Sequence, residues 1–497
     1  MVAGDDSATL FGVSRPLLTF LACLLSSIPA AALVPLLPTP SARHAYNVAV
    51  GAATCWFAYG GMRASVAIWG LTLASYAAMC ALPRWLSGHL VFLATFSFLI
   101  LSHVTSLDAS AWRRGDIDFT GTLMIVTLKL VSAAMDYHDG ANPRTSSTSP
   151  TPLPRLPALL PFLGFVFFPA ALLVGPPFPY AAYDDYIEGR GLWASLYPQQ
   201  HLPPPGSPPF PPRLLHALKA LVKALLCLAA YHTLSQLLPP SALLQPAFFS
   251  RSFPARYLHV ALTLFAYRWM FYFIWAVAEA ALILSAFGFS GFKATKNSQG
   301  KTDGERRDGG RSNGQEGEGG QKQQQLEADW SMACNAHMWV VEVTGSAAQL
   351  ATNWNIGVSR WLRTYVYDRM TPPSGKASLT TLLITQAVSA LWHGLHPGYY
   401  LFFLSAAIAQ DASKLLHRLY QSIPPHRHWQ RRLAWLAQVL YTRVLVGYAP
   451  LGFILLRADL TFRVWRSLYF VGSVLPLVLS ALLPPLIPPP KRQKKDS

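Results

Sequence analysis

Long apolar segments separated by short polar or proline-containing links run along most of this chain. They lie at residues 16–37, 45–60, 64–82, 88–105, 119–135, 156–174, 214–237, 256–290, 378–393, 398–416, 433–456 and 464–487. A helix rises 1.5 Å per residue, so about 20 apolar residues cross the hydrocarbon core of a bilayer. The pattern predicts an all-α polytopic membrane protein with about 10–12 membrane helices, some of them tilted or re-entrant because several segments are shorter than a full span.

One of these segments ends in an ionisable side chain. Residues 377–392 carry no charge, His393 follows directly, and Gly394, Pro397 and Gly398 then break the helix. Sixteen helical residues extend roughly 24 Å, which places His393 at membrane depth or near its far edge. An ionisable group there is costly unless it faces a cavity or a partner. His393 is therefore either part of a functional site or a histidine that only bonds a neighbouring helix.

Two polar residues share the helix face of His393. Gln386 and Ser389 precede it by seven and four residues, so all three form a polar stripe on an otherwise apolar helix. Such a stripe favours contact with water or substrate. The helix break frees backbone polar groups, which lipid tolerates only where the backbone packs in protein or lines a cavity.

A second polar cluster lies at residues 351–370. As a helix, its arginines Arg360, Arg363 and Arg369, together with its aromatic residues, form an amphipathic surface suited to the membrane interface. In the other interpretation, the arginines meet phosphates while Asn353 or Asn355 points inward. The Asn-Trp-Asn sequence also fits a plain helix N-cap.

Three further features carry polar groups into apolar surroundings. Lys129 lies within the 119–135 segment, where it either extends its charge to the interface or contacts substrate. The Gly-Pro-Pro sequence within 172–189 predicts a rigid turn at the interface. Glu279 is buried in the 256–290 segment, which is long enough for one tilted helix or two shorter ones, and a buried carboxylate needs a partner.

Composition supports one membrane domain. Of 497 residues, 52% are hydrophobic and 13% are charged, about half the charged fraction of soluble domains. The predicted domain covers residues 1–490 and includes 16–37 as a retained membrane helix. A polar loop at 293–329 has too few apolar residues to form a core and is predicted to be disordered. Residues 491–497 form a basic tail.

The net charge of +17 comes from basic residues spread through short loops. This pattern is typical of cytoplasmic loops that face anionic headgroups, and it argues against a nucleic-acid-binding domain. Segments 356–376 and 417–432 and the tail are basic and are predicted to lie on one side, the cytosol. Lys494 and Lys495 resemble a dilysine retrieval address, which predicts a multi-pass protein of the endoplasmic reticulum membrane with a cytosolic C-terminus. The five cysteines show no paired spacing, so neither a disulfide framework nor a metal site is expected.

Both polar clusters resemble motifs of a known family. The sequence SALWHGLHPGYY at 389–400 resembles the histidine signature of the membrane-bound O-acyltransferase family, and NWNIGVSRWLRTYVYDRM at 353–370 resembles the asparagine-containing motif that precedes it. The resemblance is closest to the lysophospholipid acyltransferase branch and covers roughly residues 50–470. Three further stretches support that branch: 118–140, 174–189 and 272–291.

The resemblance implies helices around a buried catalytic chamber, with His393 and Asn355 as the catalytic pair. It implies acyl transfer from acyl-CoA, a co-substrate, to a lysophospholipid hydroxyl, with lysophosphatidylcholine-type acceptors expected and no cofactor or metal. His396 stands where an aromatic residue is commoner. A neutral imidazole suits the base that such a transfer needs, and an asparagine amide suits an oxyanion donor. The expected substrate-contacting residues are Arg360, Arg363, Arg369, Ser389 and Gln386.

Three other functions compete with this interpretation. The same superfamily includes neutral-lipid and protein O-acyltransferases. In a membrane transporter or channel, His393 would act as a proton or substrate relay, although no inverted repeat is visible in the sequence. A non-catalytic scaffold is the third option, and the paired polar clusters argue against it.

Overall fold

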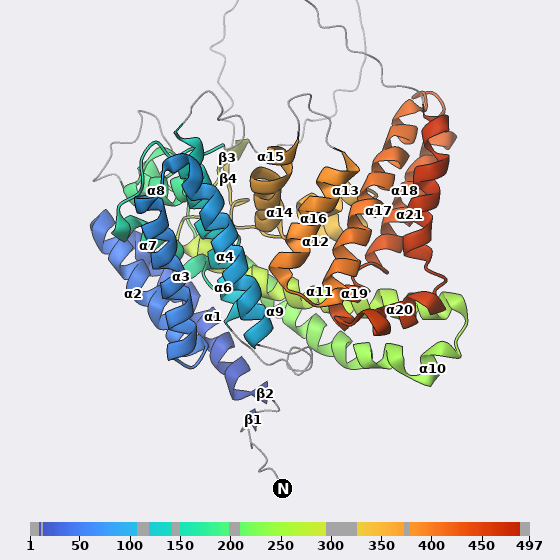
Figure 1. Ribbon diagram of the computed structural model, residues 1–497, viewed down its shortest axis with the longest axis horizontal. Coiled ribbons are helices and arrows are strands. Elements are labelled where there is room, and N and C mark those ends of the chain that lie inside the picture. The colour runs from blue at the N-terminus through green and yellow to red at the C-terminus, as the bar shows by residue number, and fades with distance from the viewer. Residues whose placement is uncertain are drawn as a thin grey trace, which may run out of the picture.

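The computed structural model describes residues 9–10, 13–106, 119–141, 150–197, 209–294, 326–371 and 378–487. Helices make up most of these residues (Figure 1), which confirms the predicted all-α class. The strands within the described ranges form two short antiparallel pairs, β1 (Thr9–Leu10) with β2 (Val13–Ser14) and β3 (Gly291–Ala294) with β4 (Leu326–Asp329).

Ten described helices precede the 293–329 loop. They are α1 (Arg15–Leu33), α2 (Pro40–Ala58), α3 (Met62–Ala81), α4 (Arg84–Ser106), α6 (Thr120–Asp139), α7 (Leu159–Val166), α8 (Tyr180–Glu188), α9 (Leu214–Leu237), α10 (Pro246–Phe249) and α11 (Phe253–Leu284).

The helices after that loop carry both polar clusters found in the sequence. They are α12 (Met338–Val343), α13 (Ala347–Asn353), α14 (Ile356–Leu362), a π-helical turn (Arg363–Tyr367), α15 (Asp368–Met370), α16 (Leu379–His393), α17 (Pro397–Ser422), α18 (His428–Val446), α19 (Leu451–Leu455), α20 (Ala458–Ser467) and α21 (Val471–Leu482).

Fewer helices can cross a membrane alone than the sequence predicted. Among the described residues six are long and apolar enough, or seven if α20 and α21, bent by 72° at their junction, form one broken span. Two of the helices that do not qualify lie beside or carry the polar clusters. Helix α16 has only 15 residues, and α6 is buried along nearly its whole length and includes buried Lys129, Asp136 and Asp139. A helix enclosed by other helices need not be apolar all round.

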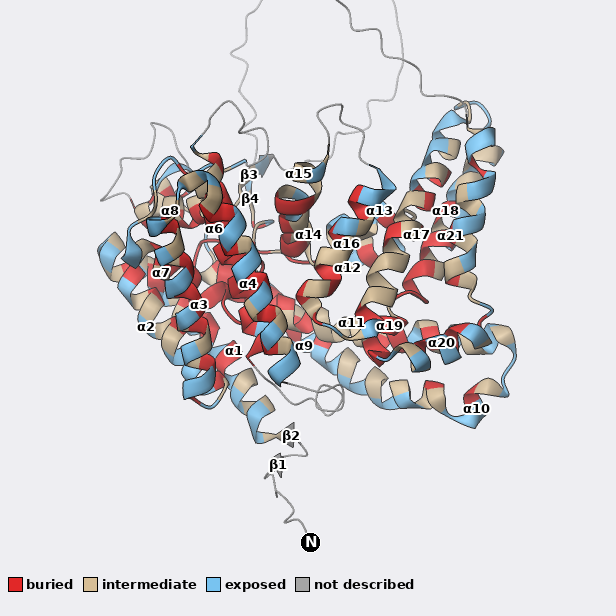
Figure 2. Cartoon of the chain, viewed as in Figure 1, coloured by how far each residue is buried: buried red, intermediate tan, exposed pale blue. Residues whose placement is uncertain are grey.

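The outer helices instead expose apolar side chains. On α9, Leu218 is 53% exposed and Leu225 is 65% exposed. Figure 2 shows the contrast between such outward faces and the buried centre around α6. Exposed leucine rows of this length fit contact with lipid.

The predicted segment at 156–174 is not a membrane span. Helix α7 ends after eight residues at Val166, and Phe165 and Phe168 are fully buried. Lys129 of α6 caps this helix end, since its Nζ donates to the carbonyl oxygens of Phe165 and Val166 at 3.2 and 3.1 Å. An ammonium group at a helix C-terminus satisfies carbonyls that have no intrahelical partner. Lys129 is thus a buried helix cap, and neither predicted role, interface or substrate contact, matches its position.

The Gly-Pro-Pro turn is buried rather than interfacial. Pro176 and Pro177 pack against the first turn of α14, and a Cβ atom on Gly357 would lie 2.7 Å from the Pro176 Cβ. Only glycine permits this approach, because real Cβ contacts are not that short. The turn therefore fixes the position of α14.

Helix α6 holds the two segments that carry the polar clusters. Trp361 of α14 donates from its indole to the Leu128 carbonyl, and Trp392 of α16 donates to the Met124 carbonyl, both at 2.9 Å. Tyr365 in the π-helical turn donates to Asp136 Oδ1 at 2.9 Å. Helices α14 and α16 are thus attached to the same rigid element.

The predicted partner of Glu279 is present. Helix α11 is a single helix of 32 residues, and Lys223 of the adjacent α9 contacts Glu279 at 2.5 Å. At the end of α11 the predicted disordered loop begins and ends in paired strands, with Ala294 opposite Leu326. Residues 295–325 lie outside the described residues, as do the 491–497 tail and its two lysines.

The described residues that belong to or adjoin the segments predicted to share one side lie at one edge of the molecule. In Figure 1 the end of α15, the turn between α17 and α18 and the C-terminal end of α21 all reach the upper edge, whereas α20 lies at the lower edge. These described ends therefore lie on one side of the molecule, and the assignment of that side to the cytosol stays a prediction.

Candidate active site

His393 is the last residue of α16, where the chain reverses. Gly394 has φ +126°, a conformation that favours glycine, and α17 then begins at Pro397. The imidazole is surrounded by aromatic rings, with centroids 4.8 Å away for Phe403, 5.2 Å for Phe453 and 5.7 Å for Tyr399. The predicted helix break therefore lets the chain turn so that aromatic residues surround the histidine.

One hydrogen bond defines which imidazole nitrogen is free. His393 Nδ1 lies 2.7 Å from the backbone carbonyl oxygen of Ser389. A carbonyl oxygen only accepts, so Nδ1 carries the proton and Nε2 of the neutral ring keeps its lone pair. Among the described residues no hydrogen bond to Nε2 is present. The nitrogen that can accept a proton is thus available to a ligand.

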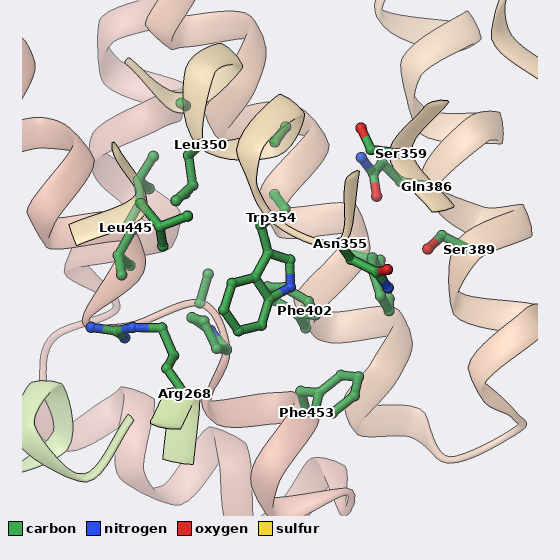
Figure 3. A pocket seen from close by; sticks show the side chains of 18 of the residues that line it. Arg268, Leu350, Trp354, Asn355, Ser359, Gln386, Ser389, Phe402, Leu445 and Phe453 are labelled. Atoms are coloured by element: carbon green, nitrogen blue, oxygen red, sulfur yellow. The ribbon is translucent and has the colours of Figure 1, made fainter. Parts of the chain in front are cut away.

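His393 lines a cavity of about 260 Å³. The wall is mostly apolar and includes Trp354, Phe402 and Phe453, with polar groups at few points (Figure 3). Gln386 and Ser389 also line it, so the predicted polar stripe of α16 faces one chamber. Arg268 of α11 lies across the chamber from these residues in Figure 3. A largely apolar cavity with few convergent polar groups is the usual form of a ligand site.

Asn355 lines the same cavity from the junction of α13 and α14. Its backbone is left-handed with φ 47°, which asparagine tolerates better than most residues. It occupies the N-cap position of α14, yet its side chain makes no capping bond. The interpretation of Asn355 as a plain helix cap is therefore wrong, and its amide is directed to other contacts.

Comparison with known proteins agrees with this geometry. Residues 107–449 match the membrane-bound O-acyltransferase family, a range that includes both polar clusters and α6. This chain belongs to that family.

Several curated relatives extend the similarity to nearly the whole chain. The chain is 33% identical to lysophospholipid acyltransferase 2 of Arabidopsis thaliana, over 99% of both chains. It is 30% identical to lysophospholipid acyltransferase 1 of the same plant, over 98% of both. Membrane-bound glycerophospholipid O-acyltransferase 1 of Mus musculus is 26% identical over 98% of this chain and 93% of its own.

The second histidine of the 389–400 sequence, His396, has a different environment. His396 is the N-cap residue of α17, and its ring contacts Tyr399 with centroids 5.9 Å apart. It is not among the residues that line the cavity. The geometry favours His393 as the imidazole that meets a ligand.

The three arginines of the asparagine motif have separate positions. Arg369 donates two hydrogen bonds of 2.5 and 3.2 Å to Asp139 of α6. Its guanidinium group therefore forms an ion pair inside the protein. Arg360 and Arg363 are exposed and do not line the cavity. Arg363 approaches Asp368 at 3.6 Å, a surface contact that leaves it accessible.

Sequence reasoning missed three groups near this chamber of the O-acyltransferase fold. Arg268 is paired with Glu342 through contacts of 2.8 Å. His103 of α4 lies 3.1 Å from the Trp392 carbonyl. Asn335 bonds both Asn355 and the start of α14. The sequence shows Arg268 and His103 as ionisable residues in apolar segments, but it does not show the partners of these three residues, because each partner lies at least 20 positions away.

Proposed function

We propose that this protein is an acyl-CoA-dependent lysophospholipid O-acyltransferase. The observation that carries the proposal is that His393 and Asn355, from two different helical segments, line one largely apolar chamber. Family membership supports acyl transfer to a hydroxyl, and the names of the plant and mouse relatives support a lysophospholipid acceptor.

In the proposed reaction, His393 Nε2 takes the proton of the lysophospholipid hydroxyl while the hydroxyl oxygen attacks the thioester carbon of acyl-CoA. The carbonyl oxygen becomes an oxyanion, and the Asn355 amide donates a hydrogen bond to it. The carbon–sulfur bond then breaks, the new ester is released as phospholipid, and the sulfur takes the proton back from His393 to give CoA. General base catalysis contributes about 10²–10⁴ in rate, and a donor to the oxyanion about 10²–10³.

The apolar wall supports this chemistry by excluding water. An acyl thioester hydrolyses when water reaches it, and each hydrogen bond to the oxyanion is stronger in a dry site. A cavity of about 260 Å³ is slightly smaller than the usual range of ligand pockets. It therefore suits the reacting groups, with the remainder of each substrate extending outward.

The proposed access routes follow the distribution of charge. Acyl-CoA would enter from the cytosolic side past Arg360 and Arg363, whose exposed guanidinium groups suit phosphates. The lysophospholipid would enter from the bilayer. The protein would act in the endoplasmic reticulum membrane with its C-terminus in the cytosol.

The test is an assay of the full chain, purified in detergent, with labelled oleoyl-CoA. The acceptors are a panel of lysophospholipids with different headgroups, a monoacylglycerol and an acceptor peptide. Labelled phospholipid is the expected product. Product on the monoacylglycerol or the peptide, with none on any lysophospholipid, would instead assign the chain to a neutral-lipid or protein O-acyltransferase.

A further inference from the structure

Asn335 is a buried polar residue between the start of α14 and the chamber. It is 2% exposed and belongs to the segment that precedes α12. Its backbone carbonyl accepts from the Ile356 N–H at 2.9 Å. Its side chain makes two further bonds, to the Gly357 N–H and to the Asn355 side chain.

These hydrogen bonds determine the orientation of both side-chain amides. The Gly357 N–H can only donate, so the atom that meets it at 2.9 Å is Asn335 Oδ1. Asn335 Nδ2 is then directed at Asn355, and a donor requires an acceptor, so it meets Asn355 Oδ1 at 3.1 Å. Asn355 Nδ2 is the atom left over. Among the described residues it has no hydrogen-bond partner.

We propose that Asn335 is a positioning residue, which acts by holding the Asn355 amide with its nitrogen turned toward the chamber. The inference rests on the proposed acyl transfer and adds a residue to it. It also explains why Asn355 has no capping role, since Asn335 supplies the cap of α14 in its place.

The backbone alone does not set this orientation. The last torsion of an asparagine side chain is broad and roughly two-fold, so an amide without a fixed partner presents nitrogen or oxygen to the same point. The two orientations have opposite effects, because Nδ2 donates to an oxyanion whereas Oδ1 repels it. A fixed donor on the far side of Asn355 removes the wrong orientation before substrate binds.

The central variant is Asn335→Asp. A carboxylate oxygen still accepts from the Gly357 N–H and suits a helix N-terminus, so α14 keeps its cap. The donor to Asn355 is lost, and the Asn355 amide is then expected to turn its nitrogen toward the new carboxylate. We expect kcat to fall about 10²-fold with the KM of both substrates within about threefold. The melting temperature should stay within a few degrees of the parent.

Asn335→Ala controls for the added charge. It also removes the donor to Asn355, so kcat should fall as well. This variant loses the cap of α14 and should therefore melt at a lower temperature than Asn335→Asp. The double variant Asn335→Ala/Asn355→Ala should be no slower than Asn355→Ala alone, because residues that act through one another are not additive. Asn353→Asp is the matched control. Asn353 bonds the Gln349 carbonyl at 2.8 Å and does not line the cavity, so its turnover should equal that of the parent.

Acyl transfer by the parent protein is measured first, so that failure of the proposed function is recognised separately. With an active parent, normal kcat in Asn335→Asp would show that the donor is not needed. A slow Asn335→Asp beside a normal Asn335→Ala would assign the loss to the new charge. Fully additive losses in the double variant, or an Asn335→Asp protein that does not fold, would limit Asn335 to a structural role.

Discussion

The charged side chains of α6 and the polar side chains of the chamber meet opposite conditions. On α6, Lys129 caps α7, Asp136 accepts from Tyr365 at 2.9 Å and Asp139 is paired with Arg369. In the chamber, by contrast, His393 Nε2 and Asn355 Nδ2 have no hydrogen-bond partner among the described residues.

The difference separates polar groups that stabilise the fold from polar groups that wait for a ligand. An unpaired buried polar group costs about 1–3 kcal/mol, and an unpaired charge costs more, so a helix core retains charges only when they are paired. The chamber keeps its unpaired atoms because the paired network on α6 holds α14 and α16 in place through Trp361 and Trp392. Variants of the chamber should therefore change rates, and variants of α6 should change stability.

The largest effect is expected from His393→Ala. Loss of the base should lower kcat by about 10²–10⁴ while the melting temperature changes little, because the one hydrogen bond of the side chain to described residues is to a carbonyl of its own helix. Steady-state kinetics beside a thermal melt give both numbers. His396→Ala is the paired variant and should keep near-parent turnover. The reverse result would move the assignment to His396.

Asn355→Ala should lower kcat by about 10²–10³, since its amide contributes in the transition state. The change removes no cap from α14, because Asn335 caps that helix. Circular dichroism melts of the variant should fall by a few degrees at most, because Asn335 Nδ2 loses its acceptor and alanine tolerates the left-handed backbone less well than asparagine. An enzyme that melts early and still turns over normally would contradict the catalytic role.

On the α6 side, Asp139→Asn should mainly reduce stability. It breaks a pair whose side chains are 6% and 16% exposed, and breaking such a buried pair typically costs about 3–5 kcal/mol. Turnover measured well below the melting temperature should stay within a few-fold. Asp368→Asn is the control, since its pair with Arg363 has side chains 40% and 71% exposed and contributes about 0–1 kcal/mol. Equal melts for both variants would show that the α6 pair does not stabilise the fold.

Arg363→Ala should raise the KM for acyl-CoA by about three- to tenfold and leave kcat unchanged. A guanidinium on a CoA phosphate binds ground and transition states alike, and exposed charges are partly screened by salt. The KM of the variant should also depend less on ionic strength. Arg457→Ala at the start of α20, on the opposite edge of the molecule, serves as the control. Identical KM values would remove Arg363 from the proposed entry route.

The smallest effect is expected from deletion of residues 297–325, which lie outside the described part of the chain. Strands β3 and β4 bring the two ends together at Ala294 and Leu326, so a short linker can replace the segment at little cost. Acyl transfer should stay within about threefold of the parent. A folded but inactive deletion protein would indicate that the segment regulates the chamber.

The sequence by itself determined the helical class, the membrane character and the face of α16 that carries Gln386, Ser389 and His393. Hydropathy and the 3.6-residue helical period depend only on residues close together in the sequence, so they can be read before the fold is known. Asn355 could also be named in advance, although only through a motif resemblance. Its local sequence fits a helix cap equally well.

Tertiary structure alone decided which polar groups have partners. Arg369 meets Asp139 across 230 positions, and Lys129 meets the carbonyls of α7 across 36 and 37. Arg369, which was expected to bind phosphate, is therefore part of an ion pair. The segment expected to be a membrane span contains the short helix α7, which Lys129 caps. The proposed role of Asn335 likewise depends on the contact between its amide and that of Asn355. The role of a polar side chain depends on which atoms lie close to it after folding. The distances between residues that are far apart in the sequence cannot be read from the sequence.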